Sequence, residues 1–506
     1  MILPVTIEDI LKANVYQIAE MTPIHPAKKL SHILQNTVLL KREDLQGVFS
    51  FKCRGACNKI YSLTPEEMRR GIIAASAGNH AQGVAAAAQT QSITATIVMP
   101  RTTPTIKVSS VQTLGATVIL HGDRYDDAYE HAIQLSQSQQ MTFIHPYDDA
   151  QVIAGQGTVA MEICRQLNGQ FDYIFVPVGG GGLISGVAAW IKTLYPHIKI
   201  IGVEPENSAC LTQALNDGKR SILPFVGIFA DGVAVKQIGE LPFQIARHCV
   251  DDMVTVSIDE ICSSIKDIFE DTRTVVEPSG ALAVAGIKKY IAQHSLNDQT
   301  VVGINSGANL NFDRLRYIVE RSSIGEDKET ILSVKIPEQR GAFETFCKII
   351  SQHSITELNY RCGHPDYAHI LLSVELKDGN KEKNDIIDHL KQQQYQVHDL
   401  TDNEAAKSHI RHMIGGVPSQ PLEDERLFRF QFPERPGALL DFLSAMQGQW
   451  SISLFHYRNH GASFGRVLVG IQVPSSTEPI FKTFLSEIQY QYFEETDNLA
   501  YHHFLK

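Results

Sequence analysis

Tyr173-Ile174-Phe175-Val176-Pro177-Val178-Gly179-Gly180-Gly181-Gly182 is the stretch of this chain that decides its fold. A continuous apolar run is followed by four glycines, and a helical pattern then extends from about Leu183 to Tyr195. Consecutive glycines are entropically costly, so a turn between a buried strand and a helix is favoured over a flexible linker. Such a turn directs backbone N–H groups and the positive end of the helix dipole at an anion.

The sequence around this turn restricts the kind of anion. No lysine or arginine lies between Gly179 and Trp190, so backbone N–H groups must carry the interaction. The dinucleotide fingerprint G-x-G-x-x-G fails, because Ile184 or Ser185 stands where its last glycine should be. The motif G-x-x-x-x-G-K-[ST] does not occur in the chain. A monophosphate therefore fits better than NAD or ATP.

A second glycine turn is Ser76-Ala77-Gly78-Asn79-His80-Ala81-Gln82-Gly83. It follows the apolar run 72–75 and precedes the helix-favouring run 84–88. It again places N–H groups at the start of a helix. An ordinary strand-to-helix turn explains Gly78, but it does not explain an asparagine beside a histidine at the mouth of the turn.

Ser50-Phe51-Lys52-Cys53-Arg54-Gly55-Ala56 places one lysine between an aromatic residue and small residues. Partial removal from water lowers the pKa of a lysine, and its neutral amine can then attack a carbonyl. Most lysines lie in solvent, so this segment alone favours an ordinary surface residue. The two glycine turns favour a Schiff-base lysine instead.

Together with Ser306-Gly307-Ala308-Asn309, these segments resemble the four signature segments of fold-type II pyridoxal-phosphate enzymes. Within that group the chain is most similar to the biosynthetic threonine dehydratase family, and the resemblance covers nearly the whole chain. It implies a two-lobed α/β catalytic domain with the cofactor between the lobes, and it places the smaller lobe roughly in residues 45–150.

The resemblance also implies roles for individual residues. Lys52 would form the Schiff base with pyridoxal 5′-phosphate, and its freed amine would act as the general base at the substrate Cα. Asn79 would bond the 3′-oxygen of the cofactor, and Ser306 its pyridine nitrogen. The phosphate cradle would consist of Gly179, Gly180, Gly181, Gly182 and Leu183. The substrate carboxylate would be held by Ser76, Ala77, Gly78 and Asn79.

Ser306 bears on the choice of reaction. A hydroxyl is a neutral partner that does not hold a proton on the ring as a carboxylate would. The carbanion is then less delocalised, which favours expulsion of a β-leaving group over transamination. The resemblance implies L-threonine as substrate, with 2-oxobutanoate and ammonia as products in the first step of isoleucine biosynthesis, and L-serine is expected to react as well. Considered without the resemblance, Ser306 would be an ordinary loop serine that caps a turn.

Other functions stay open. A serine dehydratase or a β-replacement enzyme uses the same four motifs. A racemase needs a second acid/base group, and in the family's racemases a serine stands two positions before the asparagine, where this chain has Ala77. The non-enzymatic alternative is an amino-acid sensor, against which the intact Lys52 and four glycines argue.

Three further segments receive no catalytic role. Glu277 in Glu277-Pro278-Ser279-Gly280 would either flank the cofactor ring or cap a helix, and His80 is interpreted as a packing residue. Gly155-Gln156-Gly157-Thr158 is expected to be structural support. The segment 145–149 is rich in metal-ligand types but lacks ligand spacing, so no metal site is predicted.

An internal repeat occupies the C-terminal part. Ile336–Phe343 aligns with Phe432–Leu439 at an offset of 96, and 354–361 aligns with 451–458 at an offset of 97. Each copy predicts strand, loop, helix, strand and strand, and two copies indicate a paired α+β domain rather than a solenoid. The copies resemble ACT-type amino-acid-binding modules. This implies allosteric inhibition by L-isoleucine and admits L-valine as an opposing effector, while a purely structural dimerisation domain stays open.

The expected domains are the catalytic domain at 1–325, ACT-like module 1 at 330–402 and ACT-like module 2 at 425–496. The 506 residues suffice for two or three domains with ample core. Apolar runs between helical patterns predict the strands of a parallel sheet, at Thr94–Met99, Thr117–Leu120, Tyr173–Val178, Ile198–Val203 and Thr300–Ile304.

Composition restricts partners and location. The net charge of −11 argues against a nucleic-acid partner. No apolar run is long enough to span a membrane, and the N-terminal residues lack signal-peptide and transit-peptide features. The 8 scattered cysteines favour reduced thiols in the cytoplasm and argue against structural zinc. We therefore expect a cytoplasmic protein, and the resemblance implies a homotetramer, although the residues themselves do not fix the number of subunits.

Overall fold

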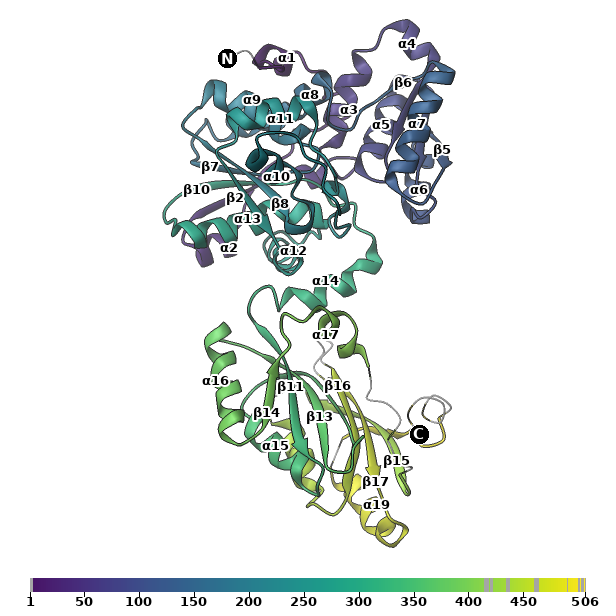
Figure 1. Ribbon diagram of the computed structural model, residues 1–506, viewed down its shortest axis with the longest axis vertical. Helices are drawn as coiled ribbons and strands as arrows, with labels where there is room; N and C mark the ends of the chain where they lie inside the picture. The colour runs from purple at the N-terminus through teal and green to yellow at the C-terminus, as the bar shows by residue number, and fades with distance from the viewer. Residues whose placement is uncertain are drawn as a thin grey trace. The chain divides into compact units, whose positions relative to one another are not determined.

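The computed structural model describes residues 3–413, 418, 422–433, 437–458, 464–488, 490–498, 501 and 505 (Figure 1). The chain divides into two compact units, Met1–Ser322 and Ser323–Lys506. Among the described residues, none of the helices has the length and hydrophobicity that a membrane crossing requires. The predicted limits 1–325, 330–402 and 425–496 stay predictions.

The larger lobe of the first unit is built on a six-stranded sheet that is parallel except for its first strand. Its strands, in spatial order, are β1 (Ile24–Pro26), β2 (Thr37–Arg42), β10 (Thr300–Asn305), β7 (Tyr173–Pro177), β8 (Lys199–Pro205) and β9 (Asp252–Val256). Because helices cover both faces, the central strands are continuous apolar runs, as the sequence indicated.

Two groups of helices bury these faces (Figure 1). One group comprises α1 (Ile7–Leu11), α8 (Ala150–Gln166), α9 (Gly182–Leu194), α10 (Cys210–Asp217) and α11 (Glu240–Cys249). The other comprises α2 (Lys28–Leu34), α12 (Ile258–Thr272), α13 (Pro278–His294) and α14 (Leu315–Ser322).

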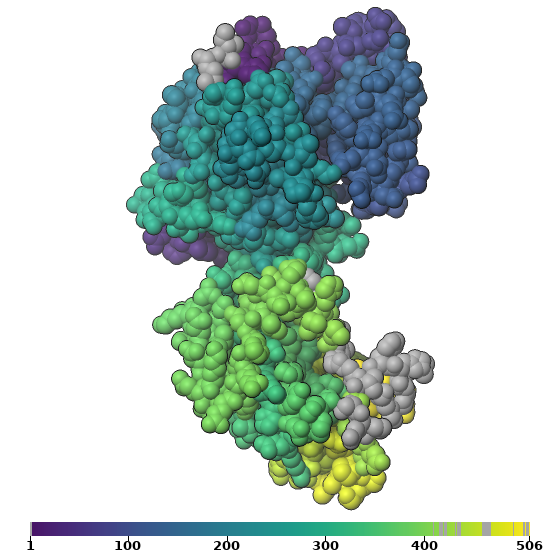
Figure 2. Space-filling view, in the orientation of Figure 1, coloured from purple at the N-terminus to yellow at the C-terminus, as the bar shows by residue number. Residues whose placement is uncertain are grey.

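The smaller lobe carries a four-stranded parallel sheet and lies beside the larger lobe, in blue next to teal in Figure 2. Its strands are β5 (Thr117–Leu120), β4 (Ala95–Met99), β3 (Ile72–Ala75) and β6 (Thr142–Phe143). One face is covered by α3 (Lys52–Tyr61), α4 (Pro65–Arg70), α5 (Asn79–Thr90) and α6 (Thr105–Thr113), and the other by α7 (Tyr125–Gln139).

The second unit is one eight-stranded antiparallel sheet with helices packed against it. Its strands are β14 (Gln396–Asp399), β11 (Glu329–Pro337), β13 (Tyr367–Glu375), β12 (Ile355–Arg361), β16 (Ser451–Arg458), β17 (Phe464–Gln472), β15 (Glu425–Pro433) and β18 (Tyr492–Glu494). The packed helices are α15 (Ala342–Ile350), α16 (Gly379–Gln392), α18 (Ala438–Ala445) and α19 (Glu478–Glu487).

The repeat predicted from the sequence is visible in this sheet. Each copy forms strand, helix, strand and strand, as β11-α15-β12-β13 and as β15-α18-β16-β17. The copies join where β12 pairs with β16, so they share one sheet. Residues 434–436 of the second copy lie outside the described residues. The fold class, a parallel α/β catalytic part followed by an α+β tandem, is confirmed.

Candidate active site

One cavity in the first unit is lined by all of the predicted cofactor-binding residues. The predicted residues that line it are Lys52, Asn79, Gly179, Gly180, Gly181, Gly182, Leu183 and Ser306. They come from the starts of α3, α5 and α9 and from the end of β10. Parallel strands end at one edge of each sheet, so the turns that follow them converge there.

The four-glycine turn requires glycine for steric reasons. Gly181 has a φ of +92°, a conformation that strains other residues. A Cβ at Gly180 would lie 2.2 Å from ring atoms of Tyr147, and one at Gly179 would lie 2.8 Å from the Cα of Val233. Helix α9 has no side-chain cap at this end, so the turn presents backbone N–H groups to an anion.

Lys52 is the first residue of α3, and its side chain reaches the cavity. Burial lowers the pKa of its amine to about 8, and the opposing charge of Glu277 limits that decrease. The amine Nζ donates to the carbonyl of Pro146 at 3.4 Å. The N–H of Phe51 donates to the carbonyl of Ser306, which joins the lysine segment to the serine segment.

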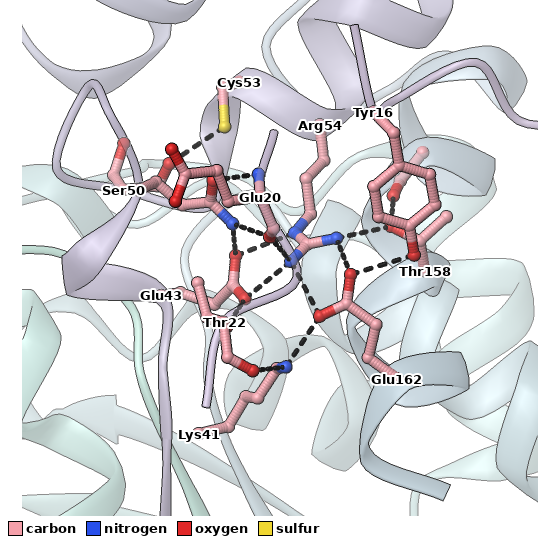
Figure 3. Close-up of polar contacts among 12 residues, drawn as sticks. Tyr16, Glu20, Thr22, Lys41, Glu43, Ser50, Cys53, Arg54, Thr158 and Glu162 are labelled. Carbon is pink, nitrogen blue, oxygen red and sulfur yellow. Dashed lines mark hydrogen bonds and ion pairs between the residues drawn. The ribbon is translucent and has the colours of Figure 1, made fainter. Parts of the chain in front are cut away.

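A fully buried ion network anchors α3 two residues beyond the lysine (Figure 3). The Arg54 guanidinium donates to both carboxylate oxygens of Glu43 and of Glu162, at 2.6–3.0 Å. It also donates to the hydroxyl of Thr158 at 3.1 Å, and Lys41 donates to Glu162 at 2.6 Å. Two cations and two anions balance there, so each buried charge has an oppositely charged partner.

The predicted supporting segment 155–158 has this anchoring function in part. Thr158 accepts a hydrogen bond from Arg54. Helices α8 and α3 cross so closely that a Cβ at Gly155 would lie 2.7 Å from the backbone of Gly55. The side chain of Lys52 is thus carried by a helix whose first turns are fixed by packing and by ionic contacts.

Glu277 contacts Asn79 and does not cap a helix through its side chain. It occupies the N-cap position of α13 without a side-chain capping bond, and its carboxylate accepts from Asn79 Nδ2 at 2.6 Å. Burial, reinforced by the charge of Asp231, raises the pKa of Glu277 to about 7. The Ser306 hydroxyl donates to the carbonyl of Ser279 at 3.1 Å, and its proton can rotate toward a ring nitrogen.

Some predicted residues do not line this cavity. Ser76, Ala77 and Gly78 form the half-buried turn before α5, and the Gly78 N–H donates to the Ser76 hydroxyl at 3.3 Å. His80 is buried, and its ring bonds the carbonyl of Ile144 at 3.0 Å. Burial and nearby Lys52 lower the pKa of His80 to about 3, in keeping with a packing role.

Other cavity residues were not predicted. Tyr147, Gly232, Val233 and Ser279 line the cavity but lie outside any strand-turn-helix pattern that singles them out. In the segment 145–149, His145 Nδ1 accepts N–H groups of its own loop, and the Asp148 carboxylate accepts the N–H groups of Glu240 and Leu241. The described residues contain no group of three or more potential metal ligands.

Comparison with known proteins gives a consistent result. The family model "Pyridoxal-phosphate dependent enzyme" matches residues 15–307, and the model "C-terminal regulatory domain of Threonine dehydratase" matches 320–410 and 419–505. A biosynthetic L-threonine dehydratase of Burkholderia multivorans is 50% identical over 502 residues, which cover 99% of each chain. The chain belongs to the family of biosynthetic threonine dehydratases.

Two more relatives agree. The biosynthetic L-threonine dehydratase of Escherichia coli is 50% identical over 98% of this chain and 96% of its own. The processed form of threonine deaminase isoform 2 from Solanum lycopersicum has a solved structure with a TM-score of 0.61 and 46% identity. That match covers 62% of this chain and 92% of the tomato chain.

As a member of this family, the protein uses pyridoxal phosphate, and the cavity fits that group. The glycine turn leaves room and N–H donors for a phosphate. A side chain at Gly179 would collide with Val233, and one at Gly180 would collide with Tyr147. Lys52 presents an amine of lowered pKa to the same cavity. Asn79 and Ser306 are neutral polar residues in the same cavity, and among the residues that the structure describes its lining contains no arginine and no lysine other than Lys52.

Proposed function

We propose that the protein catalyses the pyridoxal-phosphate-dependent dehydration and deamination of L-threonine to 2-oxobutanoate and ammonia. The observation that carries the proposal is that Lys52, Asn79, the four glycines and Ser306 line a single cavity. The family membership and the names of the relatives support the substrate. The reaction would supply isoleucine biosynthesis.

When bound, pyridoxal phosphate supplies an electron sink for the electrons of the Cα–H bond. The N–H groups of residues 179–183 would hold its phosphate, and Asn79 and Ser306 would bond its ring. Lys52 Nζ takes the substrate Cα proton, which its lowered pKa allows near neutral pH. The turn 76–79 orients the substrate carboxylate with backbone N–H groups.

Product analysis tests the proposal. The protein loaded with pyridoxal phosphate is incubated with L-threonine, and 2-oxobutanoate, ammonia and the stereochemistry of remaining threonine are measured. We expect the two products in equal amounts and no epimerised substrate, and we expect Lys52→Ala to form neither product. Turnover only in the presence of a second nucleophile would indicate β-replacement, and binding without turnover would indicate an amino-acid sensor.

We further propose that L-serine is a second substrate. Its β-hydroxyl is the same leaving group, and it lacks only the methyl group of threonine. A methyl group in an apolar pocket changes discrimination by about 10–200-fold. Comparing kcat/KM for the two amino acids tests this, and an undetectable rate with serine would contradict it.

The second unit is proposed to make the enzyme allosteric, with L-isoleucine as inhibitor and L-valine as opposing effector. The tandem repeat in one shared sheet and the match to a regulatory-domain family support this. Isoleucine must bind better to the low-activity state, and a coupling of about 1–3 kcal/mol gives roughly 5–150-fold inhibition. A chain ending near Glu326 should keep threonine turnover and lose the isoleucine response; a retained response would place the effector site elsewhere.

Assembly and location are also proposals. We propose a homotetramer, supported by large apolar side chains that are exposed in the single chain, among them Ile222, Phe225 and Ile228, at 69–75%. A cytoplasmic location is supported by eight cysteines that are all unpaired. Light scattering tests the first proposal, and a monomeric mass would contradict it.

A further inference from the structure

The side-chain amide of Asn79 is held at both ends. Its Nδ2 donates to Glu277 Oε1 at 2.6 Å, and its Oδ1 accepts from Asn309 Nδ2 at 2.6 Å. Asn309 Nδ2 also donates to the carbonyl of Val48 at 2.9 Å. The hydroxyl of Ser279 donates to Glu277 Oε1 at 3.3 Å. We call Asn79, Glu277 and Asn309 the amide clamp.

The clamp permits one orientation of the Asn79 amide. An amide nitrogen donates two hydrogen bonds and the oxygen only accepts, so the two ends are not interchangeable. When ionised, the Glu277 carboxylate requires the nitrogen, and the N–H of Asn309 requires the oxygen. The Asn309 amide cannot rotate by 180° without placing its oxygen against the carbonyl of Val48. Rotating the Asn79 amide by 180° would therefore break both hydrogen bonds. It would place donor against donor and acceptor against acceptor.

The three residues differ in their access to the cofactor cavity. Asn79 and Glu277 line it, whereas Asn309 lines only the neighbouring cavity, which it shares with Glu277. They also come from different lobes, because Asn79 begins α5 of the smaller lobe, while Glu277 precedes α13 and Asn309 follows β10 of the larger lobe. Asn309 therefore acts on the cavity through Asn79.

We propose that Asn309 is a positioning residue for the cofactor, because it keeps Asn79 turned so that the remaining N–H of that amide is available to the cofactor ring. The inference rests on the role that the proposed function gives Asn79. One hydrogen bond of this kind corresponds to a change in affinity of about 2–12-fold. Loss of the Asn309 N–H is expected to weaken pyridoxal phosphate binding by that factor and to alter the visible spectrum of the bound cofactor.

The test is Asn309→Asp, which replaces the donor by an acceptor of nearly the same shape. Asn311→Ala is the matched control, since Asn311 lies two residues further along, lines the neighbouring cavity and accepts the N–H of Asp313 with its side chain. Pyridoxal phosphate affinity, the visible spectrum at several pH values and the melting temperature of the apoprotein are measured. We expect weakened affinity and a changed spectrum only in Asn309→Asp. Its apoprotein melting temperature is expected to fall as well, because the new carboxylate oxygen faces the carbonyl of Val48, and the double-mutant cycle separates the two effects. Parent affinity and spectrum in Asn309→Asp would overturn the proposal.

A double-mutant cycle separates positioning from a general structural effect. If Asn309 acts through Asn79, then Asn309→Asp adds no further loss of affinity in an Asn79→Ala background, whereas additive losses would overturn the proposal. If Asn309→Asp does not fold, Asn309→Ala enters the same cycle. A protein that binds pyridoxal phosphate but does not convert L-threonine would overturn the proposed function alone, because the comparison of affinity and spectrum needs no turnover.

Discussion

Replacing Arg54 by methionine is expected to destabilise the first unit strongly. The change removes a fully buried cation that contacts Glu43, Glu162 and Thr158 and leaves two buried carboxylates with Lys41 as the one remaining cation of the network. Breaking a buried ion pair by deleting one partner costs about 3–5 kcal/mol, because the remaining charge is uncompensated. Methionine fills most of the volume, so a cavity adds little.

The two tryptophans make this loss measurable in the first unit alone. Trp190 lies in α9, and Trp450 lies in the second unit, so a Trp450→Phe background leaves a single fluorescence probe. In that background Arg54→Met should lower the urea midpoint of the Trp190 transition by about 1 M or more. Lys12→Met is the control, since Lys12 forms an exposed pair with Glu8 and should leave the midpoint unchanged. A midpoint for Arg54→Met equal to that of the control would refute the reasoning.

Three further changes test the cavity. The rate at which the apoprotein takes up pyridoxal phosphate should rise with pH, with a midpoint at about 8, and then level off, because burial lowers the pKa of Lys52. Glu277→Gln should move this midpoint to lower pH, since the Glu277 charge raises the pKa of Lys52. A rate that keeps rising toward pH 10.5, the ordinary lysine value, would contradict the burial of Lys52. Gly180→Ala should weaken pyridoxal phosphate binding by about 10-fold, because its Cβ would meet the Tyr147 ring. Gly47→Ala is the control and should leave the affinity unchanged, because a Cβ there meets no atom within 4 Å. Equal affinities of the two variants would show that the phosphate cradle does not need Gly180. Ala77→Ser should add some racemase activity, because it restores a hydroxyl for the far face of the ring; chiral analysis of unreacted serine that finds no D-isomer would count against this geometry.

Local sequence patterns were sufficient to predict much of the fold. Buried parallel strands are continuous apolar runs, so the predicted Thr117–Leu120 matches β5, and Tyr173–Val178 differs from β7 by one residue. The four glycines could be placed at a cavity, because only a strand-turn-helix unit accounts for them. The repeat was found because both copies keep their Pro/Gly loops at a nearly constant offset.

Other parts of the site depend on contacts between distant segments. Arg54, Glu43 and Glu162 are residue types that usually lie on the surface. They are buried together only because α3 crosses α8 next to the segment that follows β2. Val233 reaches the cavity from a segment with no regular pattern before it. For Glu277 the sequence allowed a helix cap or a cavity residue, and the hydrogen bond from Asn79 shows that it lines the cavity.

The most direct test of the central claim is the rate of 2-oxobutanoate formation from L-threonine across an isoleucine titration. The full-length protein loaded with pyridoxal phosphate is compared with Lys52→Ala under identical conditions. The proposed function predicts turnover that falls roughly 5–150-fold as isoleucine saturates, and no turnover above background in Lys52→Ala. Absence of 2-oxobutanoate with the full-length protein, or an undiminished rate in Lys52→Ala, would contradict it.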